Sequence, residues 1–119
     1  MKTKIILIVF LVAVFVMFAG TSCLKKETER LVKEEAKTEK EQAIKAAKKL
    51  FEQKKAEGID MSNGPCLSNE IIPGWVADVA HSPRQPIDDK PENQCPAYRE
   101  GRAKHFVELD LDGNLIKAY

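Results

Sequence analysis

The first 22 residues constrain this chain more than any other segment. Lys2 and Lys4 precede an unbroken apolar run from Ile5 to Ala19. A positive start followed by about 7–15 apolar residues is typical of a secretory signal peptide. A bilayer-spanning helix needs about 20 apolar residues, which this run reaches only by including the residues up to Leu24. We therefore expect residues 1–22 to be a signal peptide or a membrane anchor.

Small residues lead up to a cysteine at the end of this run. The sequence Gly20-Thr21-Ser22-Cys23 resembles the lipobox of prokaryotic lipoproteins, although an aliphatic residue is usual where Gly20 stands. The resemblance implies cleavage before Cys23 and a lipid on its thiol. Ordinary cleavage near Ser22, with no lipid, is the alternative. With lipidated Cys23 or an uncleaved N-terminal helix as the tether, we expect a cell membrane or envelope protein whose folded part lies on the extracytoplasmic side.

The charge distribution argues against nucleic acid as a partner. Residues 25–57 contain 11 Lys or Arg against 8 Glu, and residues 58–119 contain 6 basic against 10 acidic side chains. The part of the chain after the apolar run is therefore nearly neutral, whereas a nucleic-acid-binding domain normally carries a basic face. The basic segment is next to the apolar run, where it could approach anionic lipid head groups.

Residues 24–57 have the composition of a long helix, since they are rich in Lys, Glu and Ala and contain neither Pro nor Gly. Residues 23–42 have too few apolar positions for a core-facing stripe, so we expect a charged helical spacer. From residue 43 onward, apolar residues recur at helical spacing and predict one buried face: Ala43, Ile44, Ala47, Leu50 and Phe51. Gly58 is a natural stop for this helix.

The C-terminal half is typical of strands and turns. Trp75–Ala80 is aromatic and β-branched, and Val107, Leu109 and Leu111 alternate with polar or aromatic neighbours. Turn residues separate the remaining strand candidates, which are 97–99, 103–111 and 115–119. We expect Trp75 in the core. The predicted fold class is α+β: residues 43–119 form one small domain, in which an amphipathic helix precedes an antiparallel β-meander of about four strands.

The order of one helix followed by a meander resembles the small α+β rolls of the cystatin-like kind. This is a resemblance of architecture, and it implies no function. With its signal segment, the chain also resembles small envelope proteins of prokaryotes.

Cys66 and Cys95 remain as a pair once Cys23 is assigned to the lipid or the anchor. In an oxidising compartment such a pair predicts a disulfide. A closed loop of about 30 residues would stabilise the fold by about 3–4 kcal/mol in the chain-entropy model. Two free thiols in a reducing compartment are the alternative.

The loop from His81 to Gln94 is the best candidate for a binding surface, because its prolines restrict polar side chains that could recognise a protein or small-molecule partner. The candidate residues are His81, Arg84, Gln85, Asp88, Asp89, Glu92 and Asn93. In the alternative interpretation, Arg84 pairs with Asp88 or Asp89 and only holds the loop in place.

Three further sites are weaker hypotheses. Cys66, Cys95, His81 and His105 could bind zinc, but they lack the paired spacing of a structural zinc site. A cysteine nucleophile would need a free thiol beside a histidine. The segment 110–114 resembles the start of a calcium loop without its terminal Glu. We therefore expect no metal, no cofactor and no catalytic residues. A non-catalytic binding module is the leading interpretation; a thiol enzyme or metal-binding protein and a purely structural envelope protein are the alternatives.

Overall fold

The computed structural model describes the backbone of residues 2–119 and the side chains of residues 23–119. The expected signal peptide or anchor, residues 1–22, lies outside the described side chains. Within the described part, no helix is both long and apolar enough to cross a membrane. The chain divides into two compact units, Met1–Lys37 and Thr38–Tyr119. The second unit contains the sheet and the candidate site.

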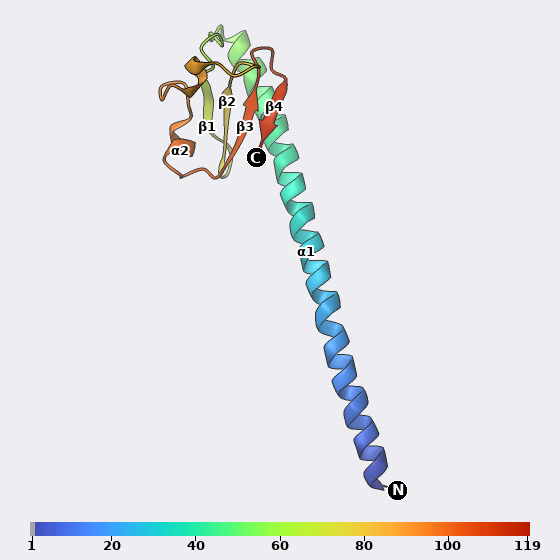
Figure 1. The fold of residues 1–119 in the computed structure, drawn as a ribbon. Helices are drawn as coiled ribbons and strands as arrows, with labels where there is room; N and C mark the ends of the chain where they lie inside the picture. The colour runs from blue at the N-terminus through green and yellow to red at the C-terminus, as the bar shows by residue number, and fades with distance from the viewer. Residues whose placement is uncertain (1) are drawn as a thin grey trace. The chain divides into compact units, whose positions relative to one another are not determined.

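The elements follow one another in a helix-first order (Figure 1). They are α1 (Lys2–Ala56), β1 (Cys66–Ile72), β2 (Trp75–Val79), the 3-10 helix η1 (Pro86–Asp89), α2 (Pro96–Arg99), β3 (His105–Leu109) and β4 (Leu115–Ala118). The described residues of α1 before position 43 are exposed to solvent. The last turns of α1 carry the buried apolar face that the sequence predicts.

Helix α1 ends in a Schellman motif. The N–H of Gly58 donates to the carbonyl of Lys55, and the N–H of Ile59 donates to the carbonyl of Lys54. Gly58 has a φ of 78°, which the left-handed cap requires. The stop expected at Gly58 is confirmed.

The sheet has the order β1-β2-β3-β4, and it is mixed. The β1–β2 and β3–β4 pairs are antiparallel, whereas β2 and β3 are parallel. The α+β class is therefore confirmed, but the expectation of an all-antiparallel meander is wrong. Parallel neighbours need a crossover of about a dozen residues or more, and residues 80–104 supply it. This segment carries both η1 and α2.

Two local assignments also differ from expectation. Residues 97–99, expected as a strand, belong to helix α2, where Pro96 occupies the first helical position and needs no N–H partner. Strand β1 (Cys66–Ile72) lies in a segment where the sequence does not predict a strand. Its pairing with β2 is interrupted by register shifts, so its apolar residues do not alternate with polar ones. The sheet has four strands, as expected, but β1 is one of them and residues 97–99 are not.

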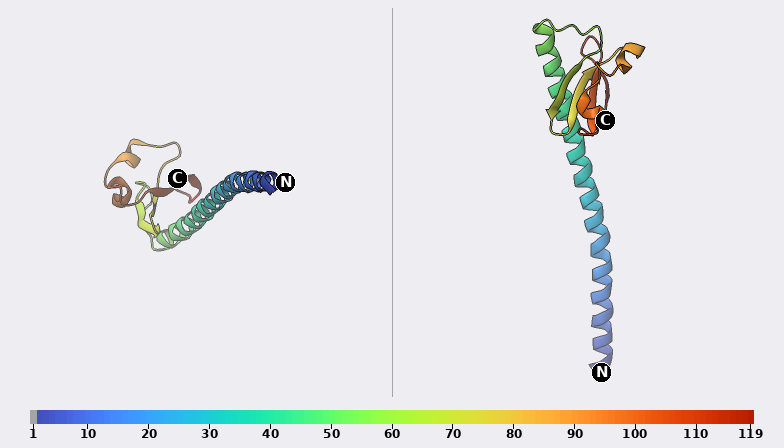
Figure 2. Two further views of the ribbon diagram at one scale, coloured as in Figure 1. Left: turned by 90° about the horizontal axis from the view of Figure 1, so that it is seen from below. Right: turned by 90° about the vertical axis from the view of Figure 1, so that its left-hand side faces the viewer.

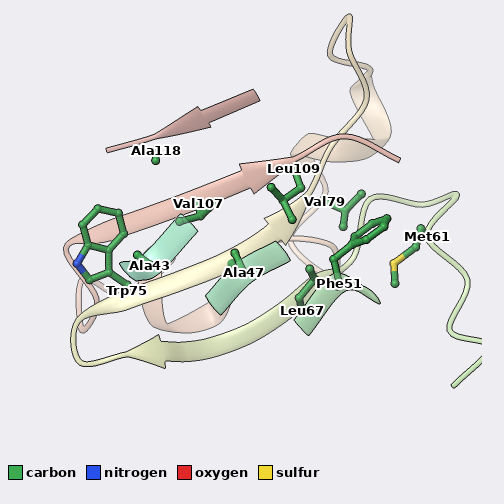
Figure 3. Packing of buried hydrophobic residues seen from close by; sticks show 11 residues of the cluster. Ala43, Ala47, Phe51, Met61, Leu67, Trp75, Val79, Val107, Leu109 and Ala118 are labelled. Carbon is green, nitrogen blue, oxygen red and sulfur yellow. The ribbon is translucent and has the colours of Figure 1, made fainter. Parts of the chain in front are cut away.

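The sheet is covered on both faces (Figure 2). Ala43, Ala47 and Phe51 on the last turns of α1 are fully buried against one face. Figure 3 shows them together with the side chains of the strands: Leu67, Trp75, Val79, Val107 and Leu109. Trp75 is buried in this cluster, as expected, and its ring stacks on that of His105 at a centroid distance of 4.7 Å.

The opposite face of the sheet carries a smaller cluster. Val76 packs there with Cys95, Ala97 and Ala103, and the disulfide joins Cys66 to Cys95. The bond has an S–S length of 2.07 Å and a Cα–Cα distance of 4.9 Å. The disulfide predicted from the cysteine count is confirmed. It attaches α2 and the end of the crossover to β1.

Candidate functional site

Two residues of the candidate loop, His81 and Gln85, donate hydrogen bonds to one buried carboxylate, that of Asp88. Asp88 has almost no exposed surface, and its Oδ2 accepts hydrogen bonds from the backbone N–H groups of His81 (3.1 Å) and Gln85 (2.7 Å). Burial alone would raise the pKa of Asp88, but these N–H groups and the His81 ring hold it below its usual value. Because an ionised carboxylate only accepts, Nδ1 of His81 is the donor in its 2.8 Å contact with Asp88 Oδ1.

The remaining loop residues divide between internal bonds and solvent. Asn93 donates from its amide to the carbonyl of Ile87 (2.9 Å), and Arg84 donates from Nε to Asp89 (2.9 Å). Glu92 is exposed. The alternative interpretation names Asp88 or Asp89 as the partner of Arg84, and the observed pair is the one with Asp89. Several of the candidate residues therefore hold the loop in shape.

A cleft of about 620 Å³ lies on the face of the sheet opposite α1. Its floor consists of Val76 and Asp78 on β2 and of Phe106 and Glu108 on β3. The crossover and the edge strand supply the walls, with the residues Arg84, Gln94, Cys95, Tyr98, Arg99 and Lys117. The parallel pairing of β2 and β3 positions the floor, and the disulfide pins the wall that contains Cys95.

The strand register arranges the floor in two rows. Val76 is paired with Phe106, and Phe106 exchanges backbone hydrogen bonds with Tyr119. Two residues further along, Asp78 is paired with Glu108, which is paired with Lys117. Because side chains two positions apart point to the same face of a strand, an apolar row and a charged row lie next to each other.

Asp78 is the most perturbed acid of the cleft. Burial and the neighbouring Glu108 carboxylate together raise its pKa to about 7, although Arg84 opposes both. Within the described part of the chain, its buried Oδ1 has no hydrogen-bond partner. A carboxyl group that titrates near neutral pH and has an unused oxygen is a feature of binding and catalytic sites.

Arg84 connects the candidate loop to the charged row. Its Nη1 donates to Glu108 Oε2 at 2.6 Å, while its Nε holds Asp89 on the other side. Burial opposes protonation, but these two carboxylates raise the pKa of the guanidinium. The ion pair with Glu108 holds Arg84 on the cleft, which Asp78 also lines.

Aromatic and basic side chains lie at the apolar row, around Phe106. Tyr98 on α2 meets the ring of Phe106 edge-on at a centroid distance of 5.1 Å. The Nζ of Lys117 lies 5.6 Å from the centre of the Phe106 ring and 5.8 Å from that of Tyr119. Such contacts between a cation and an aromatic face are favourable. Arg99 donates to the carbonyl of Pro91 at 3.3 Å.

The other sites suggested by the sequence find different explanations. Cys66 and Cys95 are joined as a disulfide, so neither supplies a free thiol for zinc or for nucleophilic attack. His81 and His105 lie at opposite ends of the β2–β3 pair. Among the described residues, no group of three or more His, Cys, Asp or Glu side chains could hold a metal ion.

The calcium-like segment forms the turn between β3 and β4. Oδ1 of Asp110 accepts from the backbone N–H groups of Asp112 (2.9 Å) and Asn114 (2.8 Å), and Oδ2 accepts from the Asn114 amide (3.0 Å). Burial would raise the pKa of Asp110, but these hydrogen bonds lower it. The Asp, Gly and Asn residues thus serve the turn.

Among the predicted loop residues in the described chain, Arg84 is the one that lines the cleft. Sequence reasoning missed Asp78, Phe106 and Glu108, which form the floor. A signal for them exists, because Asp78 is the charged position in an otherwise apolar strand. Comparison of the chain with protein-family models, with curated proteins and with solved structures gave no match.

Proposed function

We propose that this protein is a non-catalytic binding module of the cell envelope, and that the cleft above β2 and β3 binds a small organic molecule. The cleft itself is the observation that supports this function. Its volume of about 620 Å³ falls in the usual range for small-molecule sites, which is roughly 300–1,000 Å³. Its apolar row provides contact area, and a few converging polar groups provide specificity.

The proposal includes display of this module outside the cytoplasm from a membrane tether at Cys23. The charged start, the apolar run and the lipobox-like residues before Cys23 support the tether. Within the described chain, Cys23 is exposed and is not part of a disulfide. The Cys66–Cys95 disulfide supports an oxidising compartment, since cytosolic thiols are normally kept reduced.

An intact mass of the protein extracted from its own membrane tests the tether. A chain that starts at Cys23 and carries added lipid is the expected result. A chain that retains Met1 without lipid would contradict lipidation.

A fragment screen on the full-length protein in lipid nanodiscs tests the binding site. We expect fragment binding to change the NMR chemical shifts of the backbone amides mainly at Val76, Phe106 and Lys117. The variant Tyr98→Ala should lower the affinity of these fragments, because the edge-on contact between Tyr98 and Phe106 is lost. The matched variant Tyr119→Ala removes a tyrosine that does not line the cleft, and it should have a smaller effect. Fragments that bind only elsewhere would contradict the proposed site.

A further inference from the structure

The charges that line the cleft do not balance. Three basic and two acidic side chains line it. The acidic Glu108 is matched by Arg84, whose Nη1 donates to Glu108 Oε2 at 2.6 Å. This pair leaves two basic side chains, Arg99 and Lys117, against the single carboxyl group of Asp78. The lining therefore carries an excess of positive charge, and such an excess attracts anions into a cleft.

Both remaining basic side chains are available to a ligand. In the described part of the chain, Arg99 donates to the carbonyl of Pro91 and forms no salt bridge. Lys117 is the register partner of Glu108, but among the described residues it forms no salt bridge either, and its Nζ lies 5.6 Å from the centre of the Phe106 ring. Both side chains are exposed, so they can meet a ligand without breaking an ion pair.

Asp78 determines how large the positive excess is. The charged groups that act on it are Glu108 on β3 and Arg84 and Asp88 on the crossover. Its register partner on β1, Cys66, belongs to the disulfide and does not titrate. Because burial and Glu108 raise the pKa of Asp78 to about 7, this carboxyl group changes its charge near neutral pH. When it is protonated, the two basic side chains are opposed by no unpaired carboxylate of the lining.

An apolar surface lies next to the two basic side chains. Phe106 meets Tyr98 edge-on at a centroid distance of 5.1 Å, and Val76 is the register partner of Phe106. Lys117 lies over the Phe106 ring, and Arg99 follows Tyr98 in α2. A ligand with an apolar body on these rings can therefore place an attached negative group near a cation.

We propose that the ligand is an organic acid whose carboxylate binds at Arg99 and Lys117. Its apolar body packs on Phe106 and Tyr98, and its charge favours the protonated form of Asp78. This inference rests on the proposed binding function and names the class of ligand. Binding of the anion and uptake of a proton from solvent strengthen each other, because an ionised carboxyl group in the same cleft would repel the ligand.

Isothermal titration of the full-length protein in phosphatidylcholine nanodiscs tests the inference, with empty nanodiscs as the blank. The probes are phenylacetate, phenylacetamide and phenethylamine, which have similar shapes. At both pH 6 and pH 8 they carry a negative charge, no charge and a positive charge, respectively. We expect phenylacetate to bind at least about fivefold more tightly than phenylacetamide, and phenethylamine to bind most weakly.

A double variant locates the carboxylate. Arg99→Met/Lys117→Met should reduce the preference for phenylacetate over phenylacetamide to within about twofold. The matched control Arg102→Met/Lys104→Met removes one exposed arginine and one exposed lysine that do not line the cleft, so it should preserve the preference. Because the result is a ratio of affinities in one variant, partial loss of folded protein does not imitate it.

The pH dependence of the same ratio tests Asp78. In the wild type, the preference for phenylacetate should increase about threefold from pH 8 to pH 6. Titrations in two buffers of different ionisation enthalpy should also show uptake of a fraction of a proton near neutral pH. Asp78→Asn should abolish both effects, because the titrating group is gone. Asp112→Asn changes an exposed residue outside the cleft lining and should preserve both.

The outcomes separate this inference from the proposed function. Equal affinity for phenylacetate and phenylacetamide, or tightest binding of phenethylamine, would overturn the organic acid and leave the binding site in place. So would absence of phenylacetate binding in a protein whose cleft binds neutral fragments. A preference that survives loss of both basic side chains, or a pH dependence that survives Asp78→Asn, would overturn the roles given to these residues. Absence of any ligand from the cleft would overturn both the inference and the proposed function.

Discussion

Asp78 and Glu108 are register partners on the parallel strands β2 and β3, and both side chains line the same cleft. Two carboxyl groups placed side by side on a partly buried surface repel each other when both are ionised. Arg84 neutralises the Glu108 carboxylate directly, at 2.6 Å, so the unfavourable energy of ionisation falls on Asp78. The ionised Asp78 carboxylate in the candidate site therefore destabilises the folded protein.

The free energy of unfolding should fall as the pH rises from about 4 to about 7 because of Asp78. The pKa of this carboxyl is about 7 in the folded protein and near 3.8 in the unfolded chain, so the folded state holds a proton that the unfolded state has lost. The linked loss reaches its full value above the folded pKa and is on the order of 2–4 kcal/mol. Asp78→Asn should remove it.

Urea unfolding of the wild type and of Asp78→Asn at pH 5 and pH 8 measures this effect. The variant should gain more stability at pH 8 than at pH 5. Asp112→Asn changes an exposed residue of the same type and should shift both curves equally. An equal gain at both pH values in Asp78→Asn would contradict the assignment.

Asp88 should act in the opposite direction. Its folded pKa is lowered, so its contribution to stability is present above the unfolded pKa and is lost as the pH falls through the folded value. Asp88→Ala leaves the N–H groups of His81 and Gln85 without their acceptor, which should cost about 3 kcal/mol. Equilibrium unfolding at pH 7 provides the measurement. The neighbouring exposed pair is the control, since Asp89→Ala should cost at most about 1 kcal/mol.

Reduction of the Cys66–Cys95 disulfide should lower the free energy of unfolding by about 3–4 kcal/mol, because the bond closes a loop with a sequence separation of 29. The double variant Cys66→Ser/Cys95→Ser should reproduce the loss in urea unfolding. The double variant should also lower the affinity of fragments for the cleft, because Cys95 lies in the cleft wall just before α2. Cys23→Ser should leave the unfolding of the domain unchanged, because Cys23 forms no disulfide within the described chain.

Gly113→Ala should destabilise the domain more than a substitution at another glycine with similar backbone geometry. A Cβ at Gly113 would lie 2.8 Å from two atoms of the Phe51 ring, whereas a Cβ at Gly58 would meet nothing within 4 Å. Both have positive φ values, 86° and 78°. Backbone strain costs about 1 kcal/mol at either site, and the clash at Gly113 should add roughly another 1–3 kcal/mol. Thermal unfolding of the two variants compares them directly, and equal losses would contradict the contact with Phe51.

The outcome at individual elements shows where sequence reasoning succeeds. The buried face of α1 around Ala47, the helix stop at Gly58 and the strand that starts at Trp75 depend on local periodicity and turn chemistry. Strand β1 and helix α2 were missed or misassigned, because register shifts interrupt the alternation of β1 and because 97–99 carries a strand-like composition after a helix-starting Pro96.

The candidate site follows the same division. Arg84 was predicted, and the structure places it on the cleft, but its partner Glu108 comes from a strand 24 residues away. Asp88 and His81 were proposed for partner binding, and the structure shows them hydrogen-bonded to each other inside the loop. Sequence composition shows which polar groups are available, but not which of them satisfy one another.

Local pattern and simple counting predict the amphipathic helix, three of the four strands, the α+β class and the Cys66–Cys95 pairing. Neither pattern nor counting predicts that β2 and β3 run parallel, which places Asp78 beside Glu108. Strand partners and register are set by packing between segments far apart in the chain, where the burial of one face outweighs local preference. The cleft, its charged row and the raised pKa of Asp78 all follow from that pairing.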